Sequence, residues 1–219
     1  MANTNNGRAI RSRTLMLAQL GILVAIQAVL AFTILGSIPM PTGVVATLAH
    51  LPAIIAGMLL GVKAGAFIGF SFGLFSFMVW TFTPPSPFMA FMFTPFWAVP
   101  GELVGHDRFH DYMGNFGSIL ICFVPRILVG VFAALAAKHL PKKFSANYIA
   151  GAIIGSLTNT LLVVAGMFIF FSGRIEPIWG RAATAFLGGI ITGNGISELI
   201  IAAIVCPAIV IPLKRVLRK

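Results

Sequence analysis

Ala64–Phe82 reads AGAFIGFSFGLFSFMVWTF, a stretch without a charged residue. An α-helix crosses the roughly 30 Å of membrane hydrocarbon with about 20 apolar residues, because each residue rises about 1.5 Å. Gly65, Gly69 and Gly73 are spaced by four and therefore share one stripe of such a helix. In lipid, a stripe without side chains lets a second helix backbone approach closely. The stretch predicts a transmembrane helix that packs tightly against another helix.

Five more stretches of the 219-residue chain pass the same length test on either side of this one. They are Thr14–Leu35, Val44–Gly61, Phe116–Ala137, Tyr148–Phe171 and Ala183–Pro212. Hydrophobic residues make up 58% of the sequence and charged residues only 9%, against roughly 25% charged residues in soluble domains. We therefore predict an all-α membrane protein, with six transmembrane helices in a single domain over residues 14–213.

The charged residues predict the orientation of these helices. The net charge of +10 comes from basic residues that lie between the apolar stretches, which argues against a nucleic-acid-binding face. One side of a six-helix zigzag receives most of them: Arg8, Arg11, Arg13, Lys63, Lys138, Lys142, Lys143, Lys214, Arg215, Arg218 and Lys219. The other side holds Arg108, Arg174 and Arg181 together with Glu102, Asp107, Asp111 and Glu176. Because cytoplasmic loops are enriched in Lys and Arg, we expect a multi-pass protein of the cell membrane with residues 1–13 and 214–219 in the cytoplasm.

The connection between the third and fourth predicted helices, residues 83–115, is unusually long. Its first half, Thr83–Pro100, reads TPPSPFMAFMFTPFWAVP, in which prolines exclude a continuous helix although the composition is apolar. Unpaired backbone amides are costly in lipid, so we expect an external lid or re-entrant loop that is covered by protein or lines a cavity. The alternative is an interfacial segment, because Trp97 and the phenylalanines also suit the headgroup region.

Small residues spaced by four recur in other predicted helices. The pairs are Gly21 and Ala25, Ala133 and Ala137, Gly151 and Gly155, and Gly189 and Gly193. Packing within the chain accounts for most such pairs, since small residues are common at helix contacts in membranes. Gly21 and Ala25 in the first helix are the candidate exception, a stripe for a partner protein.

Ionisable residues within a span are candidates for function, because a charge inside the bilayer is costly unless it is paired or solvated. Three occur here: His50, Arg126 and Glu198. Arg126 and Asn194 fall about ten residues below the outer ends of their helices, and Asn159 lies near the middle of its own. Polar side chains from three helices at one depth predict a pocket that the long loop closes from outside.

Arg126 follows Pro125, which leaves a backbone carbonyl of that helix without its usual donor. The guanidinium offers a planar fork suited to a carboxylate or a phosphate. An internal ion pair with Glu198 is an equal alternative, and the two roles are compatible. His50 lies two residues before Pro52, and its placement alone is more typical of a packed histidine than of a ligand contact.

Other kinds of chemistry have little support in the sequence. The repeat His106–Asp107 and His110–Asp111 could hold a metal on one helical face, but a solvated loop is the simpler interpretation and we predict no metal site. The string from Gly57 to Lys63 lacks the spacing of an ATP-binding loop. We therefore expect no cofactor, no ATP hydrolysis by this chain and no enzymatic activity.

Four strings of the sequence resemble a known family, the substrate-binding S components of energy-coupling-factor (ECF) vitamin transporters. They are TLAHLPAIIAGMLLGVKAGAFIGFSFGLFSF (Thr47–Phe77), ICFVPRILVGV (Ile121–Val131), GSLTNTLLVVAG (Gly155–Gly166) and GNGISELIIAAIVCPAI (Gly193–Ile209). The similarity extends over nearly the whole chain and resembles the pantothenate-type branch.

The resemblance implies a six-helix protein that captures a vitamin from outside with high affinity. It also implies partners, a transmembrane T component and two cytoplasmic ATPase subunits of an ECF-type ABC transporter. In the family, small residues of the first helix dock on the T component. Gly21 and Ala25 match them here, with glycine in place of the first alanine.

Pantothenate, which this branch implies as substrate, carries one carboxylate, one amide and two hydroxyl groups. The substrate-binding residues that we predict are Arg126, Asn159, Asn194, His50, Phe93 and Trp97. The arginine would bind the carboxylate, the asparagines would bind polar groups, and the aromatic side chains would cover the apolar dimethyl part.

Alternatives remain within and outside this family. Another vitamin, such as cobalamin or folate, is the nearest alternative, and cobalamin would need a much wider external mouth. A self-sufficient secondary transporter would need coupling-ion ligands and usually shows inverted repeats, and the sequence reveals neither. A membrane-embedded enzyme would need a nucleophile–base pair, which is not apparent.

Overall fold

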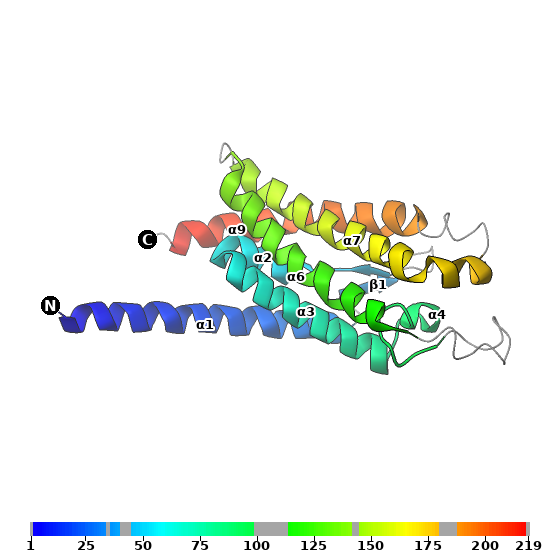
Figure 1. The fold of residues 1–219 in the computed structure, drawn as a ribbon. Helices are drawn as coiled ribbons and strands as arrows, with labels where there is room; N and C mark the ends of the chain where they lie inside the picture. The colour runs from blue at the N-terminus through cyan, green and yellow to red at the C-terminus, as the bar shows by residue number, and fades with distance from the viewer. Residues whose placement is uncertain are drawn as a thin grey trace.

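Packed helices make up most of the structure (Figure 1), a computed structural model that describes residues 2–33, 36–39, 45–98, 114–141, 145–179 and 188–217. The helices are α1 (Ala2–Phe32), α2 (Leu51–Leu60), α3 (Val62–Phe82), α4 (Pro87–Ala90), α6 (Phe116–His139), α7 (Ala146–Trp179), the π-helix η4 (Ile190–Gly195) and α9 (Ile196–Leu217). The strands are β1 (Ser37–Pro39) and β2 (Val45–Thr47). The two ends of the chain lie at the same end of the bundle (Figure 1).

Five of the described helices are long and apolar enough to cross a membrane. Their spanning segments are Arg13–Phe32, Val62–Phe82, Phe116–His139, Ala146–Gly173 and Thr192–Val216. With the shorter apolar helix α2, they confirm the prediction of a helical membrane protein. The predicted third and fourth spans agree with α3 and α6 to within a few residues, whereas α7 continues past its predicted end at Phe171 to Trp179.

The predicted second span, Val44–Gly61, is wrong in its first half. Only Leu51–Leu60 is helical, and Val45–Thr47 forms a strand that pairs antiparallel with Ser37–Pro39. Pro52 lies in the first turn of α2, where the missing N–H of proline is not needed. Gly61 ends the helix with a φ of 97°, a conformation that favours glycine. Ten residues are too few to cross the hydrocarbon, so a six-span bundle is not confirmed.

The last predicted span, Ala183–Pro212, begins among residues 180–187, which lie outside the described residues. Its described part starts with the wider helix η4 and continues as α9 through Pro207 and Pro212 to Leu217. Prolines are tolerated in transmembrane helices where neighbouring groups satisfy the freed carbonyls. The helix therefore extends beyond the predicted end by about one turn.

The glycine seam is the contact between Gly65, Gly69 and Gly73 of α3 and the backbone of α6. A Cβ on Gly65 would collide with the carbonyl of Gly130, and a Cβ on Gly69 with the carbonyl of Arg126. Side chains larger than hydrogen are thus excluded at this contact. The predicted close packing of the third helix is confirmed, and α6 lies at the centre of the bundle, with α2, α3 and α7 packed against it.

Helix α1 lies at the periphery. It contacts α2 and α3, and Figure 1 shows its first turns extending away from the other helices. Only 6% of the most apolar stretch of its spanning segment, Arg13–Phe32, is buried by the rest of the protein. Gln27 is the exception, because its side chain is fully buried and its Nε2 donates to the carbonyl of Ala49, just before α2.

The described part of the long connection, residues 83–98, folds back onto the bundle. Met89–Thr94 is buried, and Phe91 packs edge-on against Phe171 of α7 with ring centroids 5.4 Å apart. Ser118 Oγ of α6 donates to the carbonyl of Phe91 over 2.7 Å. This protein cover favours the lid interpretation over an interfacial belt. The His106–Asp107 and His110–Asp111 repeat lies outside the described residues.

Candidate functional site

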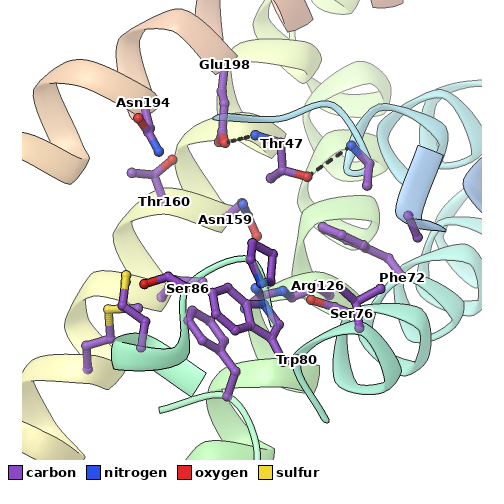
Figure 2. A pocket seen from close by; sticks show the side chains of 18 of the residues that line it. Thr47, Phe72, Ser76, Trp80, Ser86, Arg126, Asn159, Thr160, Asn194 and Glu198 are labelled. Carbon is purple, nitrogen blue, oxygen red and sulfur yellow. Dashed lines mark hydrogen bonds between the residues drawn. The ribbon is translucent and has the colours of Figure 1, made fainter. Parts of the chain in front are cut away.

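A cavity lies between α3, α6, α7 and α9, and β2 and the segment that carries α4 complete its wall. Its volume is about 140 Å³, well above the roughly 10–15 Å³ that a cavity needs to hold one water molecule. The two ends differ in chemistry (Figure 2). The arginine end comprises Arg126, Phe72, Trp80 and Phe93. The carboxylate end comprises Glu198, Asn194, Thr160 and Thr47.

Pro125 helps to position Arg126 at its end of the cavity. Proline has no N–H, so the carbonyl of Ile121, four residues earlier in α6, lacks its helical donor. Arg126 Nη1 donates to that carbonyl over 2.5 Å. The side chain is buried, and its Nε has no partner among the described residues. Donor capacity for an anion therefore remains.

Aromatic rings enclose the guanidinium. Its Cζ atom lies 5.6 Å from the ring centroid of Phe72 in α3 and 5.4 Å from that of Phe93 in the segment after α4. Phe93 also stacks on Trp80, with ring centroids 4.4 Å apart and an interplanar angle of 16°. Such rings attract a cation and exclude water. The folded-back segment is therefore part of the wall around Arg126.

The carboxylate end presents hydrogen-bond acceptors. Oε1 of Glu198 accepts from the backbone N–H of Thr47 over 2.7 Å. Oδ1 of Asn194 and Oδ1 of Asn159, which lies between the two ends, are buried and have no partner within the described part of the chain. Buried polar atoms are normally paired. Unpaired polar atoms on side chains that line a cavity indicate a site for a polar ligand.

The π-helix η4 carries Asn194 to the cavity. Gly195 at its end approaches Thr160 of α7 so closely that a Cβ there would lie 2.9 Å from Cγ2 of that threonine. Glu198 follows one turn later in α9 and faces the same cavity. π-helical turns are rare and are frequent at functional sites.

The structure brings four of the predicted substrate-binding residues to one cavity: Arg126, Asn159, Asn194 and Phe93. His50 and Trp97 do not line it. His50 is fully buried at the start of α2, and the indole Nε1 of Trp97 donates to the carbonyl of Thr81 over 2.8 Å. Both predictions relied on residue type alone, which does not reveal the direction in which a side chain points.

The alternative of an internal ion pair between Arg126 and Glu198 finds no support among the described residues. Figure 2 shows Asn159 between the two side chains, while Glu198 points toward the amide of Thr47. The two charged groups thus lie at separate ends of the cavity.

Sequence reasoning missed several lining residues. Phe72, Ser76 and Trp80 are spaced by four and form a stripe beside the glycine stripe of α3, so the helical period carries a signal for them. Thr47 has no such signal, because its bond to Glu198 joins residues 151 positions apart. Gly21 and Ala25 lie away from the cavity, on an exposed face of α1.

Comparison with known proteins connects this geometry to a family. The family model for the "ECF transporter, substrate-specific component" matches residues 15–106. The chain is also 36% identical over 203 residues to the Pantothenic acid transporter PanT of Lactococcus lactis subsp. cremoris (strain MG1363), across 91% of this chain and 94% of that protein. This chain therefore belongs to the family of ECF transporter substrate-specific components, as a multi-pass transport subunit rather than an enzyme.

Proposed function

We propose that this chain captures pantothenate from outside the cell, as the S component of an ECF-type ABC transporter. The observation that carries the proposal is the two-ended cavity. A buried guanidinium with free donor capacity lies at one end, and the polar side chains of Glu198, Asn194 and Thr160 lie at the other. Pantothenate has a carboxylate at one end and two hydroxyl groups at the other, with an amide between them.

The size of the cavity supports this choice over the alternatives. A volume of about 140 Å³ favours a small ligand over a large one. Cobalamin is many times larger, and folate has a fused ring and two carboxylates for which one arginine is a poor match. The similarity to a protein named pantothenic acid transporter points the same way.

We assign Arg126 to the carboxylate, Asn159 and Asn194 to the amide and hydroxyl groups, and Phe93 to the apolar wall. The enclosure of the guanidinium by rings and the unpaired amide oxygens support these roles. Most of the contact surface is apolar, and few polar anchors set the orientation, as in other small-molecule sites.

Isothermal titration of the purified chain tests the proposal. We expect pantothenate to bind, and Arg126→Ala to weaken its affinity by roughly 30-fold or more, since loss of one partner of a buried charged contact costs about 2–5 kcal/mol. Panthenol, which has an alcohol in place of the carboxylate, should bind weakly and equally to both proteins. Arg13→Ala, on an exposed side chain of α1, is the matched control.

Two outcomes would overturn the assignment. If pantothenate does not bind to the unaltered chain, while cobalamin or folate does, the substrate is wrong. If Arg126→Ala binds pantothenate as tightly as the unaltered chain, the carboxylate anchor lies elsewhere.

The proposal includes the partners and the orientation of the chain. Gly21 and Ala25 would dock on a T component that works with two cytoplasmic ATPase subunits, and the exposure of this face of α1 supports that role. The start of α1 and the end of α9 lie at the same end of the bundle (Figure 1), the spanning segment of α1 begins at Arg13, and the last turn of α9 holds Lys214 and Arg215. By the enrichment of basic residues inside the cell, that end would face the cytoplasm. The folded-back segment, residues 83–98, would then close the cavity from the outer side.

A further inference from the structure

The proposed contact between Arg126 and the carboxylate of pantothenate gives Glu198 no role. Its side chain is only 5% exposed and lies within a spanning segment, where an acidic group is costly unless it is paired. Within the described part of the chain, its hydrogen bond comes from the N–H of Thr47, which occupies Oε1. No ion pair with Arg126 or another described cation is present, and Oε2 remains available.

The orientation of this carboxylate is built into the fold. Thr47 ends β2, whose pairing with β1 holds the backbone, and its Oγ1 accepts from the N–H of Ala49 over 3.2 Å. Gln27 of α1 donates to the carbonyl of Ala49. The amide that fixes Oε1 is therefore itself fixed, and Oε2 is held in place before a ligand arrives. Such preorganisation is typical of a group that selects a ligand.

The nearby amides do not replace this acceptor. Figure 2 shows the oxygen of Asn159 on the side of Arg126, and the nitrogen of Asn194 toward Thr160, so Oε2 of Glu198 is an acceptor that a ligand at this end can reach. Pantothenate has three donors in its two hydroxyl groups and its amide N–H. A carboxyl oxygen with no partner among the described residues can accept from a hydroxyl group, so Glu198 would contribute to recognition of the hydroxyl groups.

We propose that Glu198 is a specificity-determining residue that accepts a hydrogen bond from a hydroxyl group of the ligand, at the end of the cavity opposite Arg126. The proposal rests on the proposed function, because it takes pantothenate as the ligand. It goes further in assigning the hydroxyl groups to a residue and in fixing the direction of the vitamin in the cavity.

Glu198→Gln is the sharpest variant. Glutamine keeps an oxygen for the N–H of Thr47 but replaces the second oxygen with an NH₂ group, which donates instead of accepting. The two probes are pantothenate and its analogue with hydrogen in place of both hydroxyl groups. Both keep the carboxylate and the amide, so contacts with Arg126 are the same for the two.

In the unaltered chain, we expect titration to give at least a 100-fold preference for pantothenate over the analogue, since sites built to bind a hydroxyl group reject ligands without it. Glu198→Gln should reduce this preference by about tenfold or more, with less than about a threefold change in affinity for the analogue. Ser197→Ala is the control, because Ser197 Oγ donates to the carbonyl of Gly193 and does not line the cavity.

The outcomes separate this proposal from the proposed function. If the unaltered chain does not bind pantothenate, the proposed function fails. If the unaltered chain binds pantothenate but Glu198→Gln weakens both probes equally, or neither, only the role of Glu198 fails. Glu198→Asp, which keeps the charge but withdraws it by one methylene, should also reduce the preference and serves if the glutamine variant does not fold.

Discussion

Gly65, Gly69 and Gly73 of α3 lie against the backbone of α6, whereas Gly21 of α1, with Ala25 four residues later, has no atom within 4 Å of the position of a Cβ. The spacing is the same in both helices. The difference lies in the opposing surface, because the backbone of α6 lies against the whole stripe of α3, with Gly130 opposite Gly65. A small-residue stripe thus becomes an internal contact where the backbone of a second helix of the same chain lies against it. Otherwise it stays open to lipid or to a partner.

The largest effect is expected at the glycine seam. Gly130→Leu should prevent α3 and α6 from packing, because even a Cβ at this position collides with the backbone of Gly65. Overpacking of this kind costs about 3 kcal/mol or more. The melting temperature of the purified protein in detergent, and its elution as a single species, measure the loss.

Gly21→Leu is the matched control for the seam, since a Cβ at this position would meet nothing within 4 Å. It should leave the melting temperature close to that of the unaltered protein. Equal destabilisation by the two substitutions would mean that the contrast between α3 and α1 is wrong.

The exposed small residues of α1, Gly21 and Ala25, should matter for assembly with partners and not for folding. On the proposal that α1 docks on a T component, Gly21→Leu combined with Ala25→Leu should reduce copurification with the ATPase subunits by at least about tenfold, which corresponds to about 1.4 kcal/mol. Affinity for pantothenate should not change, because neither residue lines the cavity.

Gly173→Leu makes the same chemical change at another open position, on α7. It should leave copurification intact. If all three subunits still copurify with the double variant, the docking surface lies on another face.

Gln27 joins the peripheral helix to the bundle, and its removal should have an intermediate effect. Gln27→Leu deletes the bond to the buried carbonyl of Ala49. Hydrogen bonds between membrane helices contribute about 0.6 to 2 kcal/mol, so we expect a modest fall in melting temperature. Gln19→Leu, on a less buried side chain of the same helix, should be neutral. A neutral Gln27→Leu would show that α1 is held by apolar contacts alone.

The smallest effect is expected where two helix ends meet at the surface. Nζ of Lys214 in α9 lies 5.1 Å from the ring centroid of Tyr148 in α7. Lys214→Met should cost about 0.5 kcal/mol, the magnitude of an exposed cation–π contact. The melting temperature, compared with that of Arg215→Met, measures it. A fall in melting temperature as large as that of Gly130→Leu would contradict the prediction that the glycine seam stabilises the protein more than this surface contact does.

The spans and the polar anchors could be predicted because each depends on local properties of the chain. Hydropathy and length identify α3, α6 and α7, since any helix in lipid must satisfy its own backbone. Arg126, Asn159 and Asn194 stand out because polar groups are rare in such segments. Their common depth follows from counting residues along straight helices.

Other features depend on contacts between distant parts of the chain. The strand Val45–Thr47 looked like part of a helix because apolar residues suit both structures, and only its pairing with Ser37–Pro39 distinguishes them. His50 and Trp97 were predicted from residue type, but neither lines the cavity. A single sequence carries no signal for the direction of a side chain that is fixed by neighbours far along the chain.

By itself, the sequence determined that this protein resides in a membrane, that α3, α6 and α7 cross it, and that Arg126 and the two asparagines are candidates for a ligand. Only the tertiary structure decided that Arg126 and Glu198 occupy opposite ends of one cavity and do not pair with each other. The physical reason is the distance along the chain over which each property is determined. Transfer of apolar residues to lipid is a property of each segment, whereas the bond from Thr47 to Glu198 requires the whole fold to bring two distant residues to 2.7 Å.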